Sequence, residues 1–515
     1  MIEIAAWGTA GLLFLSAIIE SLRYLCLSQN NNYKLGRHKK VVSYFVERSF
    51  FFLFIIVSNV LAFFLNEKIL YLSLIIAFLN FIVDIFEFFR FRTKFKFTKR
   101  GKFYFIFCLM IYIFAYTFFA IFIENIKILI SSFVFINTVN ILIIKIIEIP
   151  LNKYFCKKNK EYIIKQKNKL LSKNVTVVGI TGSYGKTSCK NILKFLLKDD
   201  FCIASTKENY NTPMGIAMTI EEMSGNEDIL IAEFGARKEG DIEELCGLFR
   251  PKIGIITGVC EQHVETFGGI GNVYKEKKKL ADYVSETNGQ CFFNVNDRNA
   301  HRMWKEYKGK KTSIALGKQA DIYADNISCS DRGSLFTLHI AGKEYKCQTN
   351  LLGKHNVLNI AVCVAVCVEL GINIEKIVEK IALLPQIKHR LEYIYANGIH
   401  IIDDSYNANE KGVRSAAETL SLFSGRKIAI LQGIVECGKK SYELNENVGK
   451  EFASVADLVM LSGTNAGAIE NGLNKCGFSG EIIHIKNIKN LNKYIKNYVK
   501  KGDVLLLQND LPDIF

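Results

Sequence analysis

The chain has 515 residues, half of them hydrophobic, and carries a formal net charge of +16. This length is sufficient for about three domains. Much of the positive charge lies in loops between apolar runs, which indicates contact with anionic lipid headgroups rather than with nucleic acid. The fourteen cysteines show no zinc-type CxxC spacing, and many, such as Cys363 and Cys367, lie in apolar stretches. We therefore expect small buried side chains rather than disulfides or a zinc site.

The first 150 residues predict an all-α transmembrane bundle. They contain five apolar runs, most of which reach the roughly 20 residues that a helix needs to cross a hydrocarbon core. The five predicted spans are Ile4 to Leu27, Phe50 to Leu65, Ile69 to Phe89, Phe103 to Ile123 and Ile126 to Ile149. The second span is short, and a signal peptide explains none of the last four.

Loops rich in basic residues alternate along the chain with nearly neutral turns, and this alternation predicts the orientation of the spans. The stretch from Arg90 to Lys102 holds seven basic residues, and further basic clusters follow the first and fifth spans. The turns at 66–68 and 124–127 are short and nearly neutral. We therefore expect a multi-pass protein of the cytoplasmic membrane, with its N-terminus outside and everything after Lys153 in the cytoplasm.

The rest of the chain predicts two α/β domains. From about residue 172, short apolar runs alternate with helical periodicity, which is typical of a largely parallel sheet. The predicted strands are Val175 to Ile180, Ile229 to Glu233, Ile253 to Thr257, Cys291 to Val295, His400 to Asp403, Lys427 to Gln432, Leu458 to Leu461 and Val504 to Leu507. We divide the chain into a membrane region (1–150), a basic juxtamembrane linker (151–172), a central domain (173–384) and a C-terminal domain (385–515).

A predicted phosphate loop joins the first of these strands to a helix. The residues that we expect to bind ATP there are Gly182, Ser183, Tyr184, Gly185, Lys186, Thr187 and Ser188. Glycines let backbone N–H groups turn toward a polyphosphate, the lysine carries a point charge, and the threonine hydroxyl is a ligand for Mg²⁺. The loop is shorter than the common GxxxxGK[ST] pattern, but its strand-to-helix context favours a phosphate site over a glycine-rich turn.

Two further residues follow strands whose carboxyl ends meet at one edge of the sheet. Glu233 ends the second predicted strand, where a Mg²⁺ ligand would belong, although a strand-end carboxylate is also an ordinary feature. His263 follows the third strand, at the edge where parallel sheets bind ligands. A single histidine is more often structural.

Several motifs in order resemble the Mur ligase family, and within it the ligases that add D-alanyl-D-alanine to a UDP-N-acetylmuramoyl-tripeptide. The matching segments, besides the phosphate loop, are Asn209 to Gly215, Glu233 to Ala236, His263 to Gly268, Gly353 to Asn359, His389 to Glu392 and Asp403 to Asn409. Each is weak alone, but together they run from Val175 to about Gly438. The resemblance implies a phosphate-loop ATPase central domain and a Rossmann-like C-terminal domain.

The resemblance also implies roles for individual residues. Thr187 and Glu233 would bind one Mg²⁺, and His263 a second metal ion. Lys277 falls where the family carries a carbamylated lysine that acts as a metal ligand, although Lys275, Lys278 and Lys279 make that alignment uncertain. The implied catalytic residues are Lys186, His263 and Lys277. The implied nucleotide contacts outside the loop are Asn356, Asn359, Arg390 and Asp404, and the implied substrate contacts are Asn211, Thr212, Tyr406, Asn407 and Asn409.

The implied reaction is ATP-dependent formation of a C–N bond in peptidoglycan precursor synthesis. A substrate carboxylate would attack the γ-phosphate, and an amine would then displace phosphate from the acyl phosphate, while a hinge near Pro385 closes the C-terminal domain. Expected cofactors are ATP and Mg²⁺. Expected partners are a small or lipid-linked cell-wall precursor, an amino acid or dipeptide amine, and membrane lipid.

The chain departs from the family at its two substrate ends. Only about twenty residues separate the last predicted span from the first strand, where the soluble enzymes carry a domain that holds the UDP-sugar. The family's Gly-Asp-Met-Leu-Glu-Leu-Gly reads Gln432-Gly433-Ile434-Val435-Glu436-Cys437-Gly438 here, without the aspartate, and the expected Lys-Gly-Ser-Arg near the end is absent. These changes leave the residues expected for ATP activation in place, but they argue against D-alanyl-D-alanine as the amine substrate.

Two alternatives stay open at this point. A poly-γ-glutamate synthetase-like membrane ligase also has an early phosphate loop, but the segment Asp404 to Asn409 favours the D-alanyl-D-alanine type. A non-catalytic ATP-binding membrane scaffold would have no need of two metal sites.

Overall fold

The computed structural model describes residues 2–30, 69–90, 98–207, 210–260, 267–317, 320–406, 408–435, 437–486 and 488–508. The second predicted span, His263 and Asn407 lie outside these described residues. The chain forms two compact units, one containing Met1–Lys160 and the other containing Glu161–Pro512.

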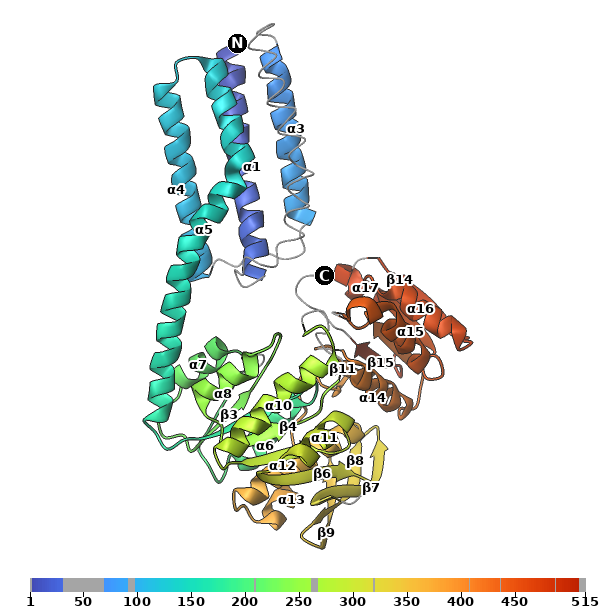
Figure 1. Cartoon of the computed structure of the whole chain (residues 1–515). Coiled ribbons are helices and arrows are strands. Elements are labelled where there is room, and N and C mark those ends of the chain that lie inside the picture. The colour runs from blue at the N-terminus through green and yellow to red at the C-terminus, as the bar shows by residue number, and fades with distance from the viewer. Residues whose placement is uncertain are drawn as a thin grey trace. The chain divides into compact units, whose positions relative to one another are not determined.

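The N-terminal unit is helical. It contains α1 (Ile2–Asn30), α3 (Ile69–Arg90), α4 (Lys99–Phe122) and the first part of α5 (Ile126–Leu171), and α1 packs against α3 and α4 (Figure 1). Thr98 caps α4, because its hydroxyl accepts a hydrogen bond from the backbone N–H of Gly101 at 3.1 Å. Apolar side chains of α4 are strongly exposed, among them Ile121 at 73% and Phe122 at 70%.

Two helical segments of the described chain are long and apolar enough to cross a membrane, Trp7–Cys26 and Arg100–Phe122. The first is mostly buried in its own unit and lies near the N-terminus, so a core helix or a signal sequence would have the same properties. Helix α3 contributes a shorter apolar stretch, Ala77–Phe86. Helix α5 continues through Pro150 to Leu171, so the predicted linker is helical up to that residue. The five-span region therefore stays a prediction.

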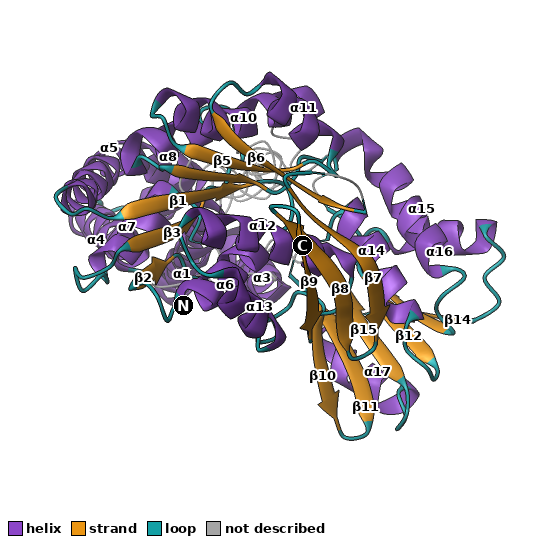
Figure 2. Cartoon of the chain, turned by 90° about the horizontal axis from the view of Figure 1, so that it is seen from below, coloured by secondary structure: helices purple, strands orange, loops and turns teal. Residues whose placement is uncertain are grey.

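The second unit begins with a nine-stranded sheet in the order β2-β3-β1-β4-β5-β6-β7-β8-β9 (Figure 2). Neighbouring strands are parallel from β2 to β7, and the last three are antiparallel. The strands are β1 (Thr176–Thr181), β2 (Ile203–Ser205), β3 (Ile229–Glu233), β4 (Ile253–Ile256), β5 (Gln290–Asn294), β6 (Lys310–Leu316), β7 (Ile322–Ser330), β8 (Gly333–Ile340) and β9 (Lys343–Thr349).

Helices cover both faces of this sheet because the parallel strands carry apolar side chains on both faces. In β1, Val178 and Ile180 join the core formed with α6 (Lys186–Leu197), α12 (Lys354–Glu369) and α13 (Ile374–Ala382). Val177 joins the opposite core. The helices of that core are α7 (Pro213–Glu221), α8 (Asp241–Phe249), α10 (Ile270–Glu286) and α11 (Arg298–Glu306).

A second, six-stranded sheet follows in the order β10-β11-β15-β12-β13-β14, parallel except for β10. Its strands are β10 (Glu392–Ala396), β11 (Ile399–Asp404), β12 (Lys427–Leu431), β13 (Leu458–Ser462), β14 (Glu481–Ile485) and β15 (Val504–Gln508). Its helices are α14 (Glu410–Ser421), α15 (Ser441–Phe452), α16 (Ala466–Lys475), α17 (Leu491–Tyr498) and the 3₁₀ turns η2 (Gly438–Lys440) and η3 (Ile488–Asn490).

The structure confirms a strand at every predicted position, with ends shifted by no more than one residue. The α/β class and the two sheets are therefore as expected. Strands β2, β6, β10 and β14 and the strands β7 to β9 were not predicted, because they are short or lack a continuous apolar run; β9, for example, has only two buried positions.

Candidate functional site

The phosphate loop lies between the end of β1 at Thr181 and the start of α6 at Lys186. Gly185 adopts φ 76°, a left-handed conformation that favours glycine. A Cβ on Gly182 would lie 1.9 Å from the Thr257 hydroxyl oxygen, so this position has no room for a side chain. The two glycines therefore let the loop turn tightly beside β4 and open the amino end of α6 toward the cavity.

Two lysines converge on one carbonyl of this loop. The ammonium nitrogen of Lys186 donates to Gly182 O at 2.7 Å, and that of Lys277 donates to the same oxygen at 3.0 Å. Burial lowers the pKa of both lysines. For Lys277, burial and then the neighbouring charge of Lys186 lower the pKa to about 7. Its amine is therefore substantially neutral near physiological pH.

The structure distinguishes Lys277 from its lysine neighbours on α10. Lys275 is exposed, Lys278 pairs with Asp282 at 2.7 Å, and Lys279 contacts carboxylates of α8 and α10. Among these lysines, only Lys277 reaches the phosphate loop in the described structure. Helix packing therefore singles out Lys277 as the lysine of this stretch that faces the phosphate loop.

Thr187 and Glu233 lie side by side at the start of α6 and the end of β3. The Thr187 hydroxyl donates to Glu233 Oε2 at 3.3 Å. The other carboxylate oxygen lies 2.8 Å from the ammonium nitrogen of Lys190, in an ion pair whose side chains are each 3% exposed. Arg390 approaches the Thr187 hydroxyl at 3.5 Å. The pair offers two oxygen ligands beside the phosphate loop.

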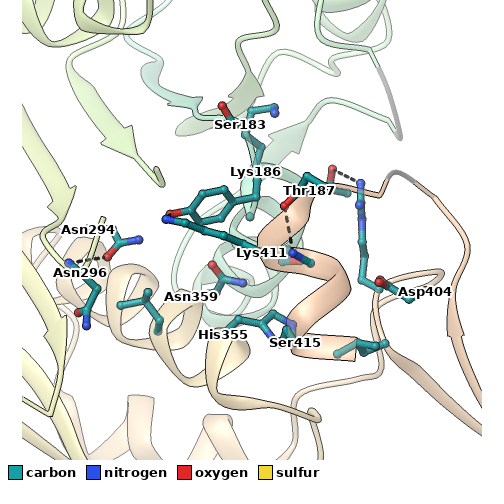
Figure 3. Close-up of a pocket in the computed structure, with 18 residues that line it drawn as sticks. Ser183, Lys186, Thr187, Asn294, Asn296, His355, Asn359, Asp404, Lys411 and Ser415 are labelled. Carbon is teal, nitrogen blue, oxygen red and sulfur yellow. Dashed lines mark hydrogen bonds between the residues drawn. The ribbon is translucent and has the colours of Figure 1, made fainter. Parts of the chain in front are cut away.

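A cavity of about 280 Å³ opens on the phosphate loop (Figure 3). One wall is the loop itself, from Ser183 to Ser188. Asn294 at the end of β5, Asn296 just after it and Asn359 of α12 form a second wall. A third wall comes from the C-terminal part of the chain, including Arg390 and Asp404. The cavity is therefore shared by both α/β domains of one compact unit.

The sequence predicts that two asparagines of α12 contact the nucleotide, but in the described structure only one of them lines the cavity. Asn359 lines the cavity, whereas Asn356 does not; its amide donates to Leu352 O at 2.9 Å, and it accepts from Asn359 at 3.4 Å. Asn356 thus supports Asn359 from behind. His355 lines the cavity and lies 2.7 Å from the Ser415 hydroxyl of α14. Burial and the charge of Arg390 lower the pKa of His355 to about 4, so this imidazole is neutral at physiological pH.

The segment that leads into β10 and β11 brings Arg390 and Asp404 into the cavity. Leu391, beside Arg390, adopts φ 48°, so this segment bends sharply. The Arg390 guanidinium lies 4.2 Å from the centre of the Tyr406 ring, a cation–π distance. Burial raises the pKa of Asp404 to about 6, although Arg390 and a hydrogen bond from Gln508 at 2.9 Å act against the rise.

The predicted substrate contacts have mostly local roles in the described structure. Thr212 caps α7 by accepting from Gly215 N at 3.3 Å, and Asn211 O accepts from Gly235 N at 3.0 Å. Asn409 caps α14 by accepting from Gly412 N at 3.0 Å, and it also lines the cavity.

Several cavity residues did not emerge from the sequence. Among them are Asn294, Asn296 and Lys411. The ammonium of Lys411 lies 2.6 Å from Asp297 Oδ2 and 3.1 Å from the Tyr184 hydroxyl. Burial raises the pKa of Asp297, but hydrogen bonds from Lys411 and from backbone N–H groups outweigh it, so the pKa lies below its usual value. The position of Lys411, two residues after the cap of a helix at the cavity, is the signal that could have found it.

The fold and the site define a phosphate-loop protein built of two α/β domains. The chain matches the model of the Mur ligase middle domain over residues 180–367 and that of the Mur ligase glutamate ligase domain over residues 389–508. Together these matches cover more than half of the sequence, and the chain belongs to the Mur ligase family.

Relatives within the family carry one recurring name. The UDP-N-acetylmuramoyl-tripeptide–D-alanyl-D-alanine ligase of Buchnera aphidicola is 30% identical over 279 residues, which cover 54% of this chain and 60% of that protein. The enzyme of that name from Bacillus subtilis is 27% identical over 340 residues, 64% of this chain and 72% of that protein. The chain thus spans less than two thirds of the first relative.

A solved structure supports the same fold. The MurF ligase of Thermotoga maritima, determined in complex with ADP, aligns with a TM-score of 0.62 at 25% identity and covers 68% of this chain and 80% of that one. The MurF of Acinetobacter baumannii aligns with a TM-score of 0.61 at 24% identity, which shows the fold alone.

Proposed function

We propose that this protein is an ATP-dependent ligase that joins a carboxylate to an amine through an acyl phosphate, in the synthesis of a peptidoglycan precursor. One observation carries the proposal: Lys186 and Lys277 converge on Gly182 O beside the Thr187–Glu233 pair, and Arg390 approaches the same pair from the C-terminal domain. This arrangement places the positive charge of Lys186 and Arg390, together with two oxygen ligands, where a polyphosphate would lie.

The first chemical step is charge neutralisation during phosphoryl transfer. Lys186 and the N–H groups at the start of α6 would hold the phosphates, and Arg390 would add a second positive charge from the C-terminal side. Thr187 and Glu233 fit Mg²⁺, because their oxygens lie 3.3 Å apart and Mg²⁺ prefers oxygen ligands. A bound ion would supply further neutralisation of the phosphate charge.

Lys277 fits the role of a carbamylated lysine. Carbon dioxide reacts with a neutral amine, and a buried lysine whose pKa is about 7 supplies one. Its nitrogen lies 3.0 Å from the phosphate loop, so the resulting carbamate would face the site as a carboxylate-like ligand. His263 is proposed as a second metal ligand from the family resemblance, and it lies outside the described residues.

The second step is attack of an amine on the acyl phosphate. The relatives' names make D-alanyl-D-alanine, or a related amine, the first candidate for the donor and a UDP-linked tripeptide the first candidate for the acceptor. Closure of the C-terminal domain about the segment after Pro385 would exclude water from the acyl phosphate. Asp404 and Asn409 would approach the nucleotide in this closed form.

We further propose that the N-terminal unit anchors the enzyme in the cytoplasmic membrane. The two long apolar helices, the exposed apolar side chains of α4 and the basic end of α5 support this proposal. An anchored ligase could take its acceptor from a lipid carrier. This assignment keeps 1–150 as the membrane region, 151–172 as the basic linker, and 173–384 and 385–515 as the two catalytic domains.

The proposal is tested by ATP-dependent phosphate release from the detergent-solubilised full chain. Acceptors would be UDP-linked and lipid-linked cell-wall precursors, each paired with D-alanyl-D-alanine or single amino acids. Turnover with the UDP-tripeptide and D-alanyl-D-alanine would identify the usual cytoplasmic step. Turnover only with lipid-linked acceptors would identify a membrane substrate. Repeated addition of glutamate would instead identify a poly-γ-glutamate synthetase-like enzyme, and no turnover with any pair would argue against a ligase.

A further inference from the structure

One face of α14 contacts the central domain. Lys411 and Ser415 are four residues apart, so they project from the same side of the helix toward the cavity (Figure 3). Ser415 lies 2.7 Å from His355, and Lys411 lies 2.6 Å from Asp297. Helix α14 is therefore attached to the central domain at two points along one face.

The Lys411 contact differs from an ordinary surface ion pair. Exposed pairs add little to stability because water screens them and both side chains lose freedom. Here the Lys411 side chain is half exposed, but that of Asp297 is only 2% exposed. Val259 N and Ala300 N donate to the other oxygen of Asp297 at 3.1 and 3.0 Å. The carboxylate is thus a fixed anchor that does not depend on Lys411 for its position.

Tyr184 connects this anchor to the phosphate loop. Its hydroxyl donates to Asp297 Oδ2 at 2.9 Å, and the Lys411 ammonium lies 4.9 Å from the centre of its ring. Its backbone oxygen accepts from the Thr257 hydroxyl at 2.5 Å. A Cβ on Gly258 would lie 2.1 Å from the Tyr184 hydroxyl, so the glycine leaves room for the ring. Tyr184 is therefore held at its hydroxyl by Asp297 and at its backbone oxygen by Thr257.

We propose that Lys411 is a positioning residue of the ligase: it latches α14 onto the phosphate loop through Asp297 and Tyr184 and so holds the nucleotide cavity in its closed form. The inference rests on the proposed function, in which closure over ATP precedes chemistry. Apparent affinity scales with the fraction of molecules in the binding-competent form. Loss of the latch lowers that fraction, so nucleotide binding weakens, whereas saturating ATP restores closure.

The test uses the full chain in detergent, with ADP and magnesium as the probe in calorimetric titrations. Lys411→Met and Asp297→Asn should each weaken ADP binding by about tenfold, within the range of coupling between linked sites. The double variant should bind no more weakly than either single variant. Lys411→Arg should restore most of the affinity, because a guanidinium can both pair with Asp297 and stack on Tyr184.

Arg414→Met is the matched control. Arg414 lies on the same helix; in the described part of the chain its ion pair is with Glu418 of that helix at 3.5 Å, and both side chains are more than half exposed. This variant should bind ADP as the wild type does. In turnover assays Lys411→Met should raise KM for ATP by about the same tenfold, with kcat nearly unchanged.

Three results would contradict the positioning role proposed for Lys411. Wild-type affinity in Lys411→Met would show that the contact does not control binding, and additive losses in the double variant would show that Lys411 acts on the nucleotide directly. A fall in kcat without a change in KM would also contradict it. Because ADP binding needs neither acceptor nor amine, failure of the latch is distinguishable from failure of the ligase reaction.

Discussion

Replacing Lys277 by alanine should abolish most of the activity, and a short carboxylic acid should restore part of it. Burial and the charge of Lys186 lower the pKa of Lys277 from 10.5 to about 7. At pH 7.5 about three quarters of such an amine is neutral, against about one in a thousand for an unperturbed lysine. The burial therefore increases the amount of amine that can react with carbon dioxide by several hundredfold.

The assay combines turnover with direct detection of the carbamate. In the wild type, activity should depend on added bicarbonate and should rise with pH through about 7, because the reactive neutral amine forms as the proton is lost. Labelling with ¹³C bicarbonate should give a carbamate signal that is absent from Lys277→Ala. Acetate or formate should rescue this variant by occupying the space left beside Gly182 O.

Lys278→Ala is the control, since Lys278 lies next in sequence but pairs with Asp282 away from the loop. It should keep both activity and the carbamate signal. Full activity in Lys277→Ala, or a carbamate signal that persists in it, would refute the reasoning. Loss of activity that no small carboxylate restores would also count against a ligand role and would favour a purely packing role.

Three further predictions concern the same cavity. Lys186→Met should lower kcat by at least about a hundredfold, because the phosphate charge loses its nearest cation, while circular dichroism shows that the protein stays folded. Lys194→Met, on the exposed side of the same helix, should leave kcat nearly unchanged. An active Lys186→Met would favour a non-catalytic scaffold. ADP affinity should fall as the pH drops through about 6, since burial raises the pKa of Asp404 to that value and its carboxylate is then protonated; Asp404→Asn should flatten this acid limb, and an unchanged profile would contradict the assignment. Gly182→Ala should destroy nucleotide binding, because a Cβ there would lie 1.9 Å from the Thr257 hydroxyl, and an alanine variant with normal ADP titrations would show that the loop can relax.

The sequence alone determined the local features of this protein. Buried parallel strands contain continuous apolar runs, so the pattern of residues is sufficient to place β1, β3, β4 and β5 in the first sheet and β11, β12, β13 and β15 in the second. The phosphate loop could also be placed, because its chemistry lies in consecutive residues between a strand and a helix. Thr187 and Glu233 belong to the same kind of inference, since the carboxyl ends of parallel strands meet at one edge.

Only the tertiary structure decided which side chains meet across long stretches of chain. Lys277 could not be chosen among its neighbours, because each residue along α10 is rotated by about 100° and only packing against β1 shows which one faces the loop. The same reason separates Asn359, which lines the cavity, from Asn356 behind it. Lys411 lies on α14 of the C-terminal domain and Asp297 caps α11 of the central domain, 114 residues earlier, so their contact exists only once both domains are folded.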